Sequence, residues 1–241
     1  MSSHHTPSLQ ADESPSPKVM ERLTQQLECL DTPEVVGWAF EQYAPHLVLA
    51  SSFGAEDMVL LDMLARVWPS PRVFYLDTGL LYPQTLHLID TVRAKYGIHP
   101  ECVATPLSLE QQAQQYGDAL WSRDPDQCCQ IRKVEPLTRH LQGERAWMTG
   151  IRRDQTLARR QTPIVAYDTR FHLTKINPLV RWTDKDVFRY LVKQEVPYNP
   201  LHDEGYPSIG CLPCTKPVTP GEDPRSGRWS GQEKTECGLH L

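Results

Sequence analysis

Short apolar segments that alternate with helical patterns are the feature that most constrains the fold of this chain. The expected strands are residues 46–51, 72–76, 101–104 and 145–151. The expected helices between them are residues 56–67, 83–96, 108–115 and 129–141, the last bent or begun afresh at Pro136. Strands that alternate with helices are typical of βαβ units, so the chain is predicted to be a single α/β domain with a mainly parallel, twisted sheet.

The segments on either side of this alternation set the expected boundaries. Residues 1–18 are rich in Ser, His and Pro and are predicted to be a disordered leader. Two helices are expected within residues 19–40, a hairpin within 164–177, and a helix over 183–194 that Thr183 caps. Prolines and glycines dominate after residue 198, where no core pattern is visible. The predicted divisions are a leader (1–18), an α/β domain (19–215) and a mobile tail (216–241).

Composition excludes several classes of partner. The 241 residues carry a formal net charge of −5, which argues against a nucleic-acid partner. No apolar run is long enough to span a bilayer, and the N-terminus lacks the apolar segment of a secretory signal. An odd number of cysteines, two of them adjacent, fits a reducing compartment better than a disulfide framework. We therefore expect a cytoplasmic protein with neither a membrane nor a nucleic-acid partner.

Four of the seven cysteines form two tight motifs, Cys128-Cys129 and Cys211-x-x-Cys214. Four thiolates are enough for one metal or iron–sulfur site. Adjacent cysteines are unusual for zinc, whose ligands are commonly two to four residues apart, so the pattern favours a [4Fe-4S] cluster. Zinc, a disulfide, a redox CxxC pair and four buried thiols remain alternatives. Two further cysteines in apolar surroundings are predicted to be core residues: Cys29 and Cys102.

The seventh cysteine, Cys237, lies close to the end of the chain. Lys234 and His240 are near it in sequence, and positive neighbours lower the pKa of a thiol. The alternative is an incidental cysteine on a frayed tail. Trp229 and Leu239 are apolar anchors with which the tail can dock, so a reactive thiol is the favoured interpretation.

Ligands of parallel sheets bind at the carboxyl ends of the strands, which places the predicted site at loops 51–57, 77–79 and 150–154. The first loop joins a strand to a helix N-terminus and suits an anion, although a tight turn needs no ligand. It lacks the Walker A pattern. Basic residues that could form a pocket for a small polyanion, rather than a solvated charged face, are Lys133, Arg152, Arg153, Arg159, Arg160, Arg225 and Arg228.

Taken together, these segments resemble the assimilatory adenylyl-sulfate (APS) and phosphoadenylyl-sulfate (PAPS) reductase family, whose fold is of the adenine-nucleotide α-hydrolase-like, PP-loop type. Seven segments carry the resemblance. They are SSFGAED from Ser51, FYLDTGLLYPQT from Phe74, CCQIRKVEPL from Cys128, GIRRDQTLAR from Gly150, INPLVRWTDKDV from Ile176, GCLPCT from Gly210 and KTECGLH from Lys234. Members with four such cysteines resemble the cluster-containing branch that reduces APS. The resemblance thus implies one [4Fe-4S] cluster on Cys128, Cys129, Cys211 and Cys214.

The resemblance also implies a two-stage thiol mechanism. Cys237 attacks the sulfur of APS, AMP leaves, and an S-sulfocysteine forms; a dithiol donor then releases sulfite. The sequence shows no appended thioredoxin-like domain, so a separate thioredoxin or glutaredoxin is expected. The expected catalytic residues are Cys237, Lys133 and His240. The expected substrate-binding residues are Ser51, Ser52, Gly54, Asp57, Leu76, Thr78, Arg152, Arg153, Arg225 and Arg228.

Three alternatives stay open at this stage. The first is a PAPS reductase with the same chemistry, and the second is a cluster-containing tRNA-thiolating PP-loop enzyme, which should carry an SGGxDS loop where this chain has SSFGAED. The third is a non-enzymatic zinc module. Whether copies of the chain form a homo-oligomer is not determined by the sequence.

Overall fold

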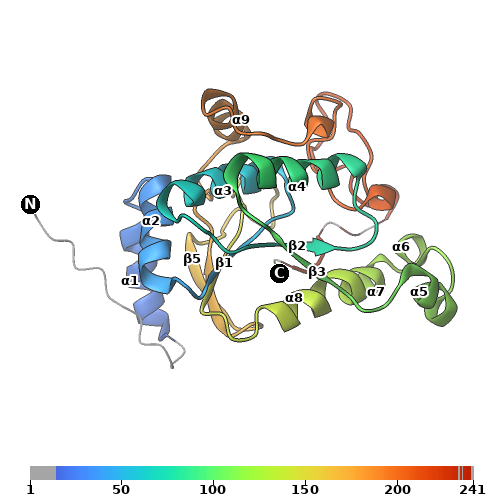
Figure 1. Ribbon diagram of the computed structural model, residues 1–241, viewed down its shortest axis with the longest axis horizontal. Coiled ribbons are helices and arrows are strands. Elements are labelled where there is room, and N and C mark those ends of the chain that lie inside the picture. The colour runs from blue at the N-terminus through green and yellow to red at the C-terminus, as the bar shows by residue number, and fades with distance from the viewer. Residues whose placement is uncertain (1–14, 233, 235, 240–241) are drawn as a thin grey trace, which may run out of the picture. The chain divides into compact units, whose positions relative to one another are not determined.

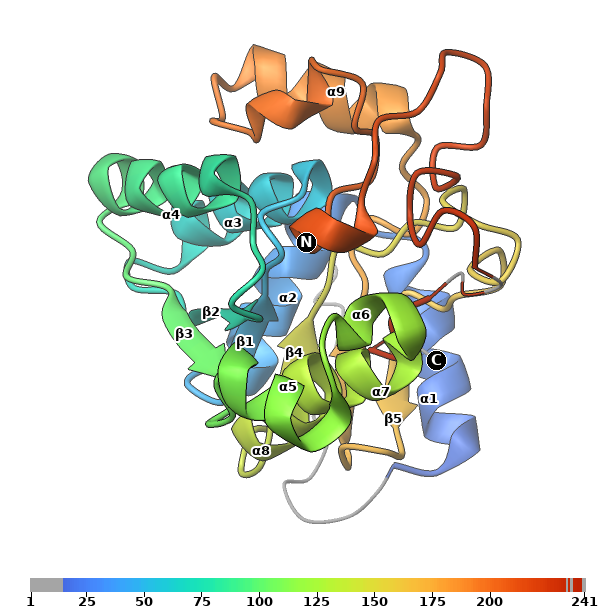
Figure 2. The same ribbon diagram turned by 90° about the vertical axis from the view of Figure 1, so that its right-hand side faces the viewer.

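A computed structural model describes residues 15–232, 234 and 236–239 and contains one mixed six-stranded sheet (Figures 1 and 2). The strand order is β3-β2-β1-β4-β6-β5. The strands are β1 (Leu47–Ala50), β2 (Val73–Asp77), β3 (Glu101–Ala104), β4 (Ala146–Met148), β5 (Val165–Asp168) and β6 (Leu173–Ile176). Only β5 is described as antiparallel to its neighbour, whereas β2–β3, β1–β4 and β4–β6 are parallel pairs. The predicted α/β class with a mainly parallel sheet is confirmed.

The chain packs as two compact units, each built from three chain segments. Unit 1 comprises the described residues up to 50 together with 56–73 and 143–196. Unit 2 comprises residues 51–55, 74–142 and 197 onward.

Unit 1 holds β1, β4, β5 and β6, the helices α1 (Pro17–Leu27), α2 (Thr32–Tyr43) and α9 (Asp184–Lys193), and all but the first residue of α3 (Ala55–Val67). Its helices begin where short polar side chains bind free backbone N–H groups. Asp31 and Glu34 form a capping box at α2, and Thr183 and Asp186 form the one predicted at α9. Helix α1 begins two residues before the expected Val19, because Ser16 accepts a hydrogen bond from the Val19 N–H and Pro17 occupies the first helical position.

Unit 2 holds a series of short helices that the sequence predicted only in part. They are α4 (Pro83–Tyr96), α5 (Leu109–Tyr116), α6 (Leu120–Arg123), α7 (Pro125–Cys129), a π-helical turn (Gln130–Val134) and α8 (Glu135–His140). The sequence predicted one helix over 129–141, bent or begun afresh at Pro136. The start was wrong, because α7 begins at Pro125, whereas α8 begins afresh at Glu135, next to the predicted break. Pro136 lacks the N–H that would bond to the carbonyl four residues earlier, and the wider turn precedes it, with the Glu135 N–H bonded to Gln130 O.

Two cysteines differ from the sequence prediction. Cys29 and Cys102 were expected in the core, but both are exposed. Cys29 lies just beyond the end of α1, where its thiol donates to Gln25 O at 3.4 Å. Cys102 lies on β3, which is an edge strand of the sheet, so its surroundings are apolar only along the sequence.

The last part of unit 2 packs more closely than its sequence suggests. It contains two 3-10 turns, Pro200–His202 and Leu212–Cys214. Asn199, Leu201 and Trp229 are buried, and an isolated antiparallel bridge joins Thr215 to Arg228. The segment is therefore packed into unit 2 although no regular apolar pattern marks it.

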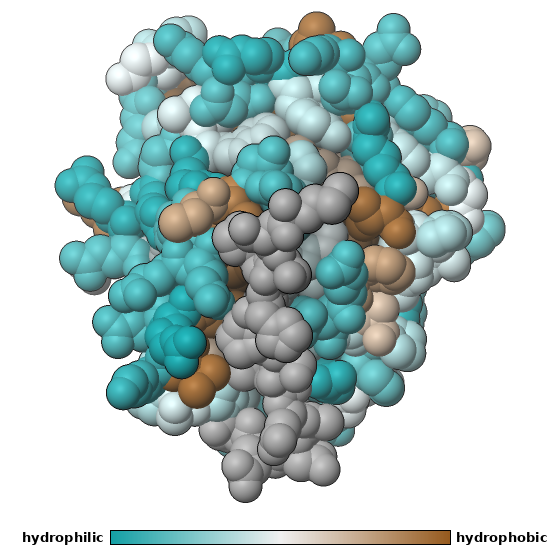
Figure 3. Space-filling model, turned by 90° about the vertical axis from the view of Figure 1, so that its left-hand side faces the viewer, coloured by the Kyte–Doolittle hydropathy of each residue, from teal (hydrophilic) through white to brown (hydrophobic). Residues whose placement is uncertain are grey.

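No helix in the described ranges combines the length and the apolarity needed to cross a membrane. Hydrophilic side chains also cover most of the face shown in Figure 3.

Candidate active site

All four cysteines of the two tight motifs line one small pocket in unit 2. Cys128 and Cys129 are the last residues of α7, which Asp124 caps and Pro125 begins. Cys211 and Cys214 lie at the two ends of the 3-10 turn, which is closed by a 2.9 Å hydrogen bond from the Cys214 N–H to Cys211 O. The structure thus brings together the four thiols that the sequence singled out.

Two threonines, Thr78 and Thr215, contact the turn that begins at Cys211. Thr215 donates through its hydroxyl to Cys211 O at 2.9 Å and accepts from the Gly210 N–H at 3.2 Å. On the other side, Thr78 Oγ1 lies 3.3 Å from Cys211 Sγ. Thr78 was expected on the adenosine side of a substrate, and the structure places its hydroxyl against a pocket cysteine.

The pocket disfavours free thiolates. Burial, with the neighbouring cysteines as the next cause, raises the pKa of Cys128 to about 11, and the same two causes raise the pKa of Cys214 to about 11. Burial also raises the pKa of Cys129, against the opposing charge of Lys133. Thiols whose pKa is raised in this way ionise at neutral pH only if a positive group joins them.

The same thiols are not gathered around one point. Among the residues that the structure describes, no three His, Cys, Asp or Glu side chains are grouped as ligands of a metal ion. The four cysteines therefore line one pocket without forming a preformed ion site in the described part of the chain.

Arg132, which the sequence did not single out, is the buried cation of this pocket. Its guanidinium donates to Gln112 Oε1 at 2.7 Å, to Thr78 O at 2.9 Å and to Leu107 O at 3.3 Å. The side chain is 4% exposed and lies in the π-helical turn next to Lys133. The sequence does show a basic residue shortly after the cysteine pair. It could not show that Arg132 is buried, because the groups that Arg132 binds are far away along the chain.

Cys237 and Lys133 lie close enough to interact, and both are partly buried. Burial alone would raise the pKa of Cys237, but Lys133, a hydrogen bond from the Leu239 N–H and Arg228 together hold that pKa below its usual value. Burial alone would likewise lower the pKa of Lys133, and the thiols, with Cys211 first and Cys237 next, raise it instead. The arrangement supports a thiolate at Cys237.

The cation beside Cys237 is therefore not the one expected from sequence proximity. Lys234 forms an ion pair with Asp126 and lies 5.5 Å from the centroid of the Trp229 ring. His240 lies outside the described residues. Lys133, more than a hundred positions away along the chain, and Arg228 supply positive charge next to Cys237.

Arg225 and Arg228 lie side by side in unit 2. Both donate through Nη1 to the hydroxyl of Ser208, at 3.3 Å and 3.2 Å respectively. Arg225 also donates to Glu236 at 3.3 Å, and the Arg228 guanidinium lies 4.5 Å from the centroid of the Trp229 ring. Within the described part of the chain, Nε of Arg228 is buried and has no hydrogen-bond partner.

The predicted nucleotide loop is a strained turn. Ser51 accepts a hydrogen bond from the Phe53 N–H at 3.1 Å, and Phe53 has a φ of 58°, a conformation that side chains other than glycine rarely adopt. Ser52 and Gly54 flank this residue, and Leu76 is half-buried on β2, directly after its buried residues. In unit 1, a Cβ on Gly150 would lie 2.6 Å from Asp57 Oδ1, so the end of β4 closely approaches the start of α3. Roles for these residues in substrate binding remain predictions.

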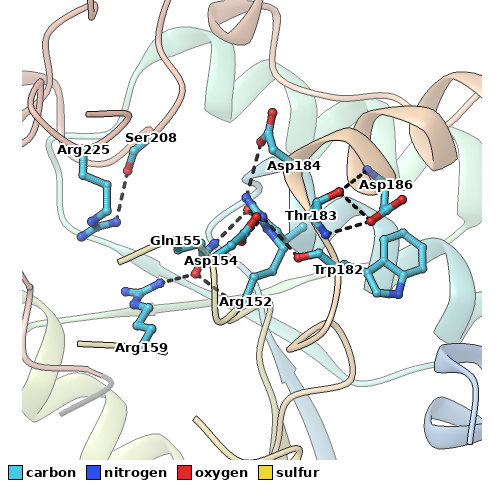
Figure 4. A network of polar contacts seen from close by, with 11 residues as sticks. Arg152, Asp154, Gln155, Arg159, Trp182, Thr183, Asp184, Asp186, Ser208 and Arg225 are labelled. Carbon is cyan, nitrogen blue, oxygen red and sulfur yellow. Dashed lines mark hydrogen bonds and ion pairs between the residues drawn. The ribbon is translucent and has the colours of Figure 1, made fainter. Parts of the chain in front are cut away.

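Two predicted substrate residues of unit 1, Arg152 and Arg153, form ion pairs with carboxylates. Figure 4 shows Arg152 among its partners. Its guanidinium forms ion pairs with Glu56, Asp154 and Asp184 and is 6% exposed. Arg153 pairs with Glu28 and donates to Thr162 O at 2.8 Å. These contacts give both arginines a structural role, and a substrate role for them remains a prediction.

Comparison with known proteins identifies the family. The pattern of the phosphoadenosine phosphosulfate reductase domain matches residues 46–217. The phosphoadenosine 5'-phosphosulfate reductase of Gloeobacter violaceus is 50% identical over 224 residues, which are 92% of this chain and 93% of that protein. The adenosine 5'-phosphosulfate reductase of Geobacillus kaustophilus is 49% identical over 209 residues, 86% and 89% of the two chains.

A solved structure agrees with these relatives. The phosphoadenylyl-sulfate reductase of Candida auris, crystallised as a phosphate complex, superposes with a TM-score of 0.76 at 31% identity. The match covers 88% of this chain and 100% of that chain. Together with the sheet order and the grouped cysteines, these similarities show that the chain belongs to the phosphoadenosine phosphosulfate reductase family.

Proposed function

We propose that this chain is a reductase that converts APS to sulfite and AMP in sulfate assimilation. The observation that carries the proposal is the Cys237 thiol held beside Lys133 and Arg228, which lower its pKa. Several curated relatives that are 46–49% identical over most of their length are named adenosine 5'-phosphosulfate reductase, which supports the choice of APS.

The proposed chemistry has two balanced steps. The Cys237 thiolate attacks the sulfur of APS, the bond between sulfur and the phosphate oxygen breaks, and AMP leaves with that electron pair. A dithiol then attacks the sulfur of Cys237, sulfite leaves, and the resulting mixed disulfide is resolved by the second thiol of the donor. The donor is oxidised to a disulfide, and sulfite is the reduced product. Thioredoxin or glutaredoxin is the proposed donor, as in the expectation from the sequence.

Both reactants of the first step are anions, so their repulsion has to be offset. Lys133, Arg225 and Arg228 are the proposed cations that hold the phosphosulfate and stabilise the charge that develops on the leaving phosphate. Their contacts with Ser208 and with Cys237 support this assignment. The nucleotide is proposed to lie against Ser51, Ser52, Gly54 and Leu76.

The four-thiol pocket is proposed to hold one [4Fe-4S] cluster on Cys128, Cys129, Cys211 and Cys214. The cluster would supply a compact negative charge and a rigid anchor for α7 and the Cys211 turn. Lys133 and Arg132 would then face it as counter-charges, and this keeps Lys133 oriented between the pocket and Cys237. Anaerobic purification and subsequent iron and zinc analysis test this assignment: four irons per chain are expected, and one zinc contradicts it.

The tail is proposed to dock and release during each cycle, because Cys237 has to meet both the substrate and a donor protein. The boundary at residue 216 also remains a proposal. Residues 1–14 of the predicted leader lie outside the described residues, and α1 already begins at Pro17. AMP is expected to slow tryptic cleavage within residues 216–241. Cleavage at the same rate with and without AMP would contradict a closing tail.

PAPS is the second candidate substrate, because the Gloeobacter violaceus relative is named phosphoadenosine 5'-phosphosulfate reductase. Sulfite formation measured side by side with APS and PAPS separates the two. A higher kcat/KM for APS is expected, and a higher value for PAPS overturns the proposed substrate. Cys237→Ser should abolish sulfite formation with either compound while the protein still binds the nucleotide.

A further inference from the structure

Two arginines of unit 2 share one uncharged oxygen. Nη1 of Arg225 and Nη1 of Arg228 lie 3.3 Å and 3.2 Å from the hydroxyl oxygen of Ser208. Two guanidinium groups this close repel each other, and a hydroxyl carries no net charge that could offset the repulsion. The arrangement therefore favours an anion next to the arginines.

In the structure that anion is the carboxylate of Glu236. Its Oε2 lies 3.3 Å from Nη2 of Arg225, and the two side chains are only 9% and 17% exposed. Glu236 directly precedes Cys237, so the residue that pairs with Arg225 is the neighbour of the proposed nucleophile in the chain. A carboxylate and a sulfate oxygen make the same kind of charge-assisted hydrogen bond to an arginine.

We propose that Glu236 is a positioning residue that binds Arg225 where an oxyanion of the substrate would bind. While the site is empty, Glu236 docks the tail on Arg225; when APS binds, its sulfonate replaces the Glu236 carboxylate on Arg225. The inference rests on the proposed function, which makes Arg225 a substrate-binding residue. Loss of the ion pair releases the residue next to Cys237, so that arrival of the substrate frees the nucleophile to turn toward sulfur.

A simpler role for Glu236 would be tail docking alone. If the ion pair only docks the tail, neutralising Glu236 leaves substrate affinity unchanged or weakens it, because a preformed part of the site is lost. If Glu236 competes with the substrate, neutralising it strengthens binding, because the substrate no longer displaces a carboxylate. The sign of the change in affinity therefore separates the two roles.

The test uses the full-length protein with its metal site loaded and with Cys237→Ser, so that bound APS is not turned over. Equilibrium dialysis measures the dissociation constants of APS and of inorganic sulfate with and without Glu236→Gln. We expect both constants to fall about fivefold or more, the size typical of coupling between contacting charges. Constants that stay the same or rise overturn the proposal.

Two further variants keep the test specific. Glu236→Asp retains the negative charge, so its dissociation constants for APS and sulfate should stay close to those of the protein with Glu236. Glu236→Gln combined with Arg225→Ala should bind sulfate no more tightly than Arg225→Ala alone; an equal tightening in the double variant would show that the competition is not for Arg225 and would overturn the proposal. Circular dichroism and the metal content verify that each variant is folded and loaded.

The two probes also separate this proposal from the proposed function. Tighter sulfate binding by Glu236→Gln in a protein that binds no APS would support the competition and remove APS as the substrate. Unchanged sulfate and APS binding in a protein that still reduces APS would remove the role of Glu236 and leave the reaction standing.

Discussion

Arg152 of unit 1 and the Arg225–Arg228 pair of unit 2 both occur in basic segments, yet their surroundings are opposite. Arg152 is surrounded by the carboxylates of Glu56, Asp154 and Asp184. Arg225 and Arg228 share one hydroxyl, that of Ser208, and Arg225 also pairs with the carboxylate of Glu236. The first site brings three carboxylates to one guanidinium, whereas the second brings two guanidinium groups to one hydroxyl.

The difference shows how an arginine that stabilises the fold is told apart from one that is available to an anion. Three carboxylates leave Arg152 no favourable interaction to offer a sulfate, because a new anion would be repelled by those already present. The pair in unit 2 brings two positive groups to one hydroxyl, so an incoming oxyanion is attracted to it. A count of basic residues in the sequence does not contain this information.

The largest expected effect is on catalysis by Arg228→Ala. Removal of a cation that stabilises the developing charge should lower kcat/KM for APS by about 10²–10³-fold. The melting temperature should change little, because Arg228 makes one long hydrogen bond and one ring contact. Steady-state kinetics and thermal unfolding are measured together, with Arg228→Lys as the variant that keeps the charge. Wild-type activity in Arg228→Ala would remove the contrast with Arg152.

Arg152→Met should show the reverse pattern. It leaves Glu56 without its buried partner and brings three carboxylates together, at a cost of about 2–3 kcal/mol after allowance for the exposure of Asp154 and Asp184. For a chain of this size, that free energy corresponds to a melting temperature lower by about 4–12 °C. At a temperature where the variant is folded, KM for APS should stay within about threefold of wild type. A large rise in KM without loss of stability would restore Arg152 as a substrate residue.

Gly210→Ala provides an indirect test of the Arg228 position. A Cβ at residue 210 would lie 2.3 Å from Nη2 of Arg228, so the guanidinium has to move away from Ser208. We expect kcat/KM to fall about tenfold, since small displacements of a substrate-holding group are costly. The matched control is Gly37→Ala in α2, where a Cβ meets nothing within 4 Å and should stabilise the helix by up to about 1 kcal/mol. Equal kinetics for both variants would contradict the assigned position of Arg228.

The smallest expected effect is on the pH dependence of Cys237. Lys133 and Arg228 lower the pKa of this thiol, so its thiolate forms at a lower pH than that of an ordinary cysteine. The rate of iodoacetamide alkylation, measured by peptide mass spectrometry, should therefore reach its midpoint below about pH 8.5. Arg228→Ala removes a favourable charge and should move the midpoint up, whereas Arg152→Met should not move it. A midpoint that is the same in all three proteins would show that Arg228 does not act on the thiol.

Much of the fold could be predicted because local signals dominate it. The buried strand at residues 46–51 and the capping residues Asp31 and Thr183 specify structure within a few neighbouring positions. The short helix α6 and the π-helical turn were missed because their geometry depends on packing around Leu120, Cys128 and Ile131. Periodicity cannot report such contacts.

The site divides in the same way. The grouping of the four cysteines was predicted from their motifs, and their common pocket agrees with it. Arg132, Ser208 and Glu236 were missed, because nothing near them in sequence marks their partners. The charge beside Cys237 was assigned to Lys234 on sequence proximity, but Lys234 is paired with Asp126 and Lys133 takes that position.

The π-helical turn before Pro136 has a consequence for how this chain can vary. A turn with one extra residue rotates the helix that precedes it by about 100° around the axis relative to the helix on its C-terminal side. Arg132 and Lys133 lie in this turn, and Cys128 and Cys129 directly precede it. A substitution at Pro136 that allowed a regular α-helix would rotate the whole cysteine segment against α8 without altering any residue of the pocket. Pro136, which has no functional group of its own, thus sets the orientation of the cysteine and basic side chains that precede it.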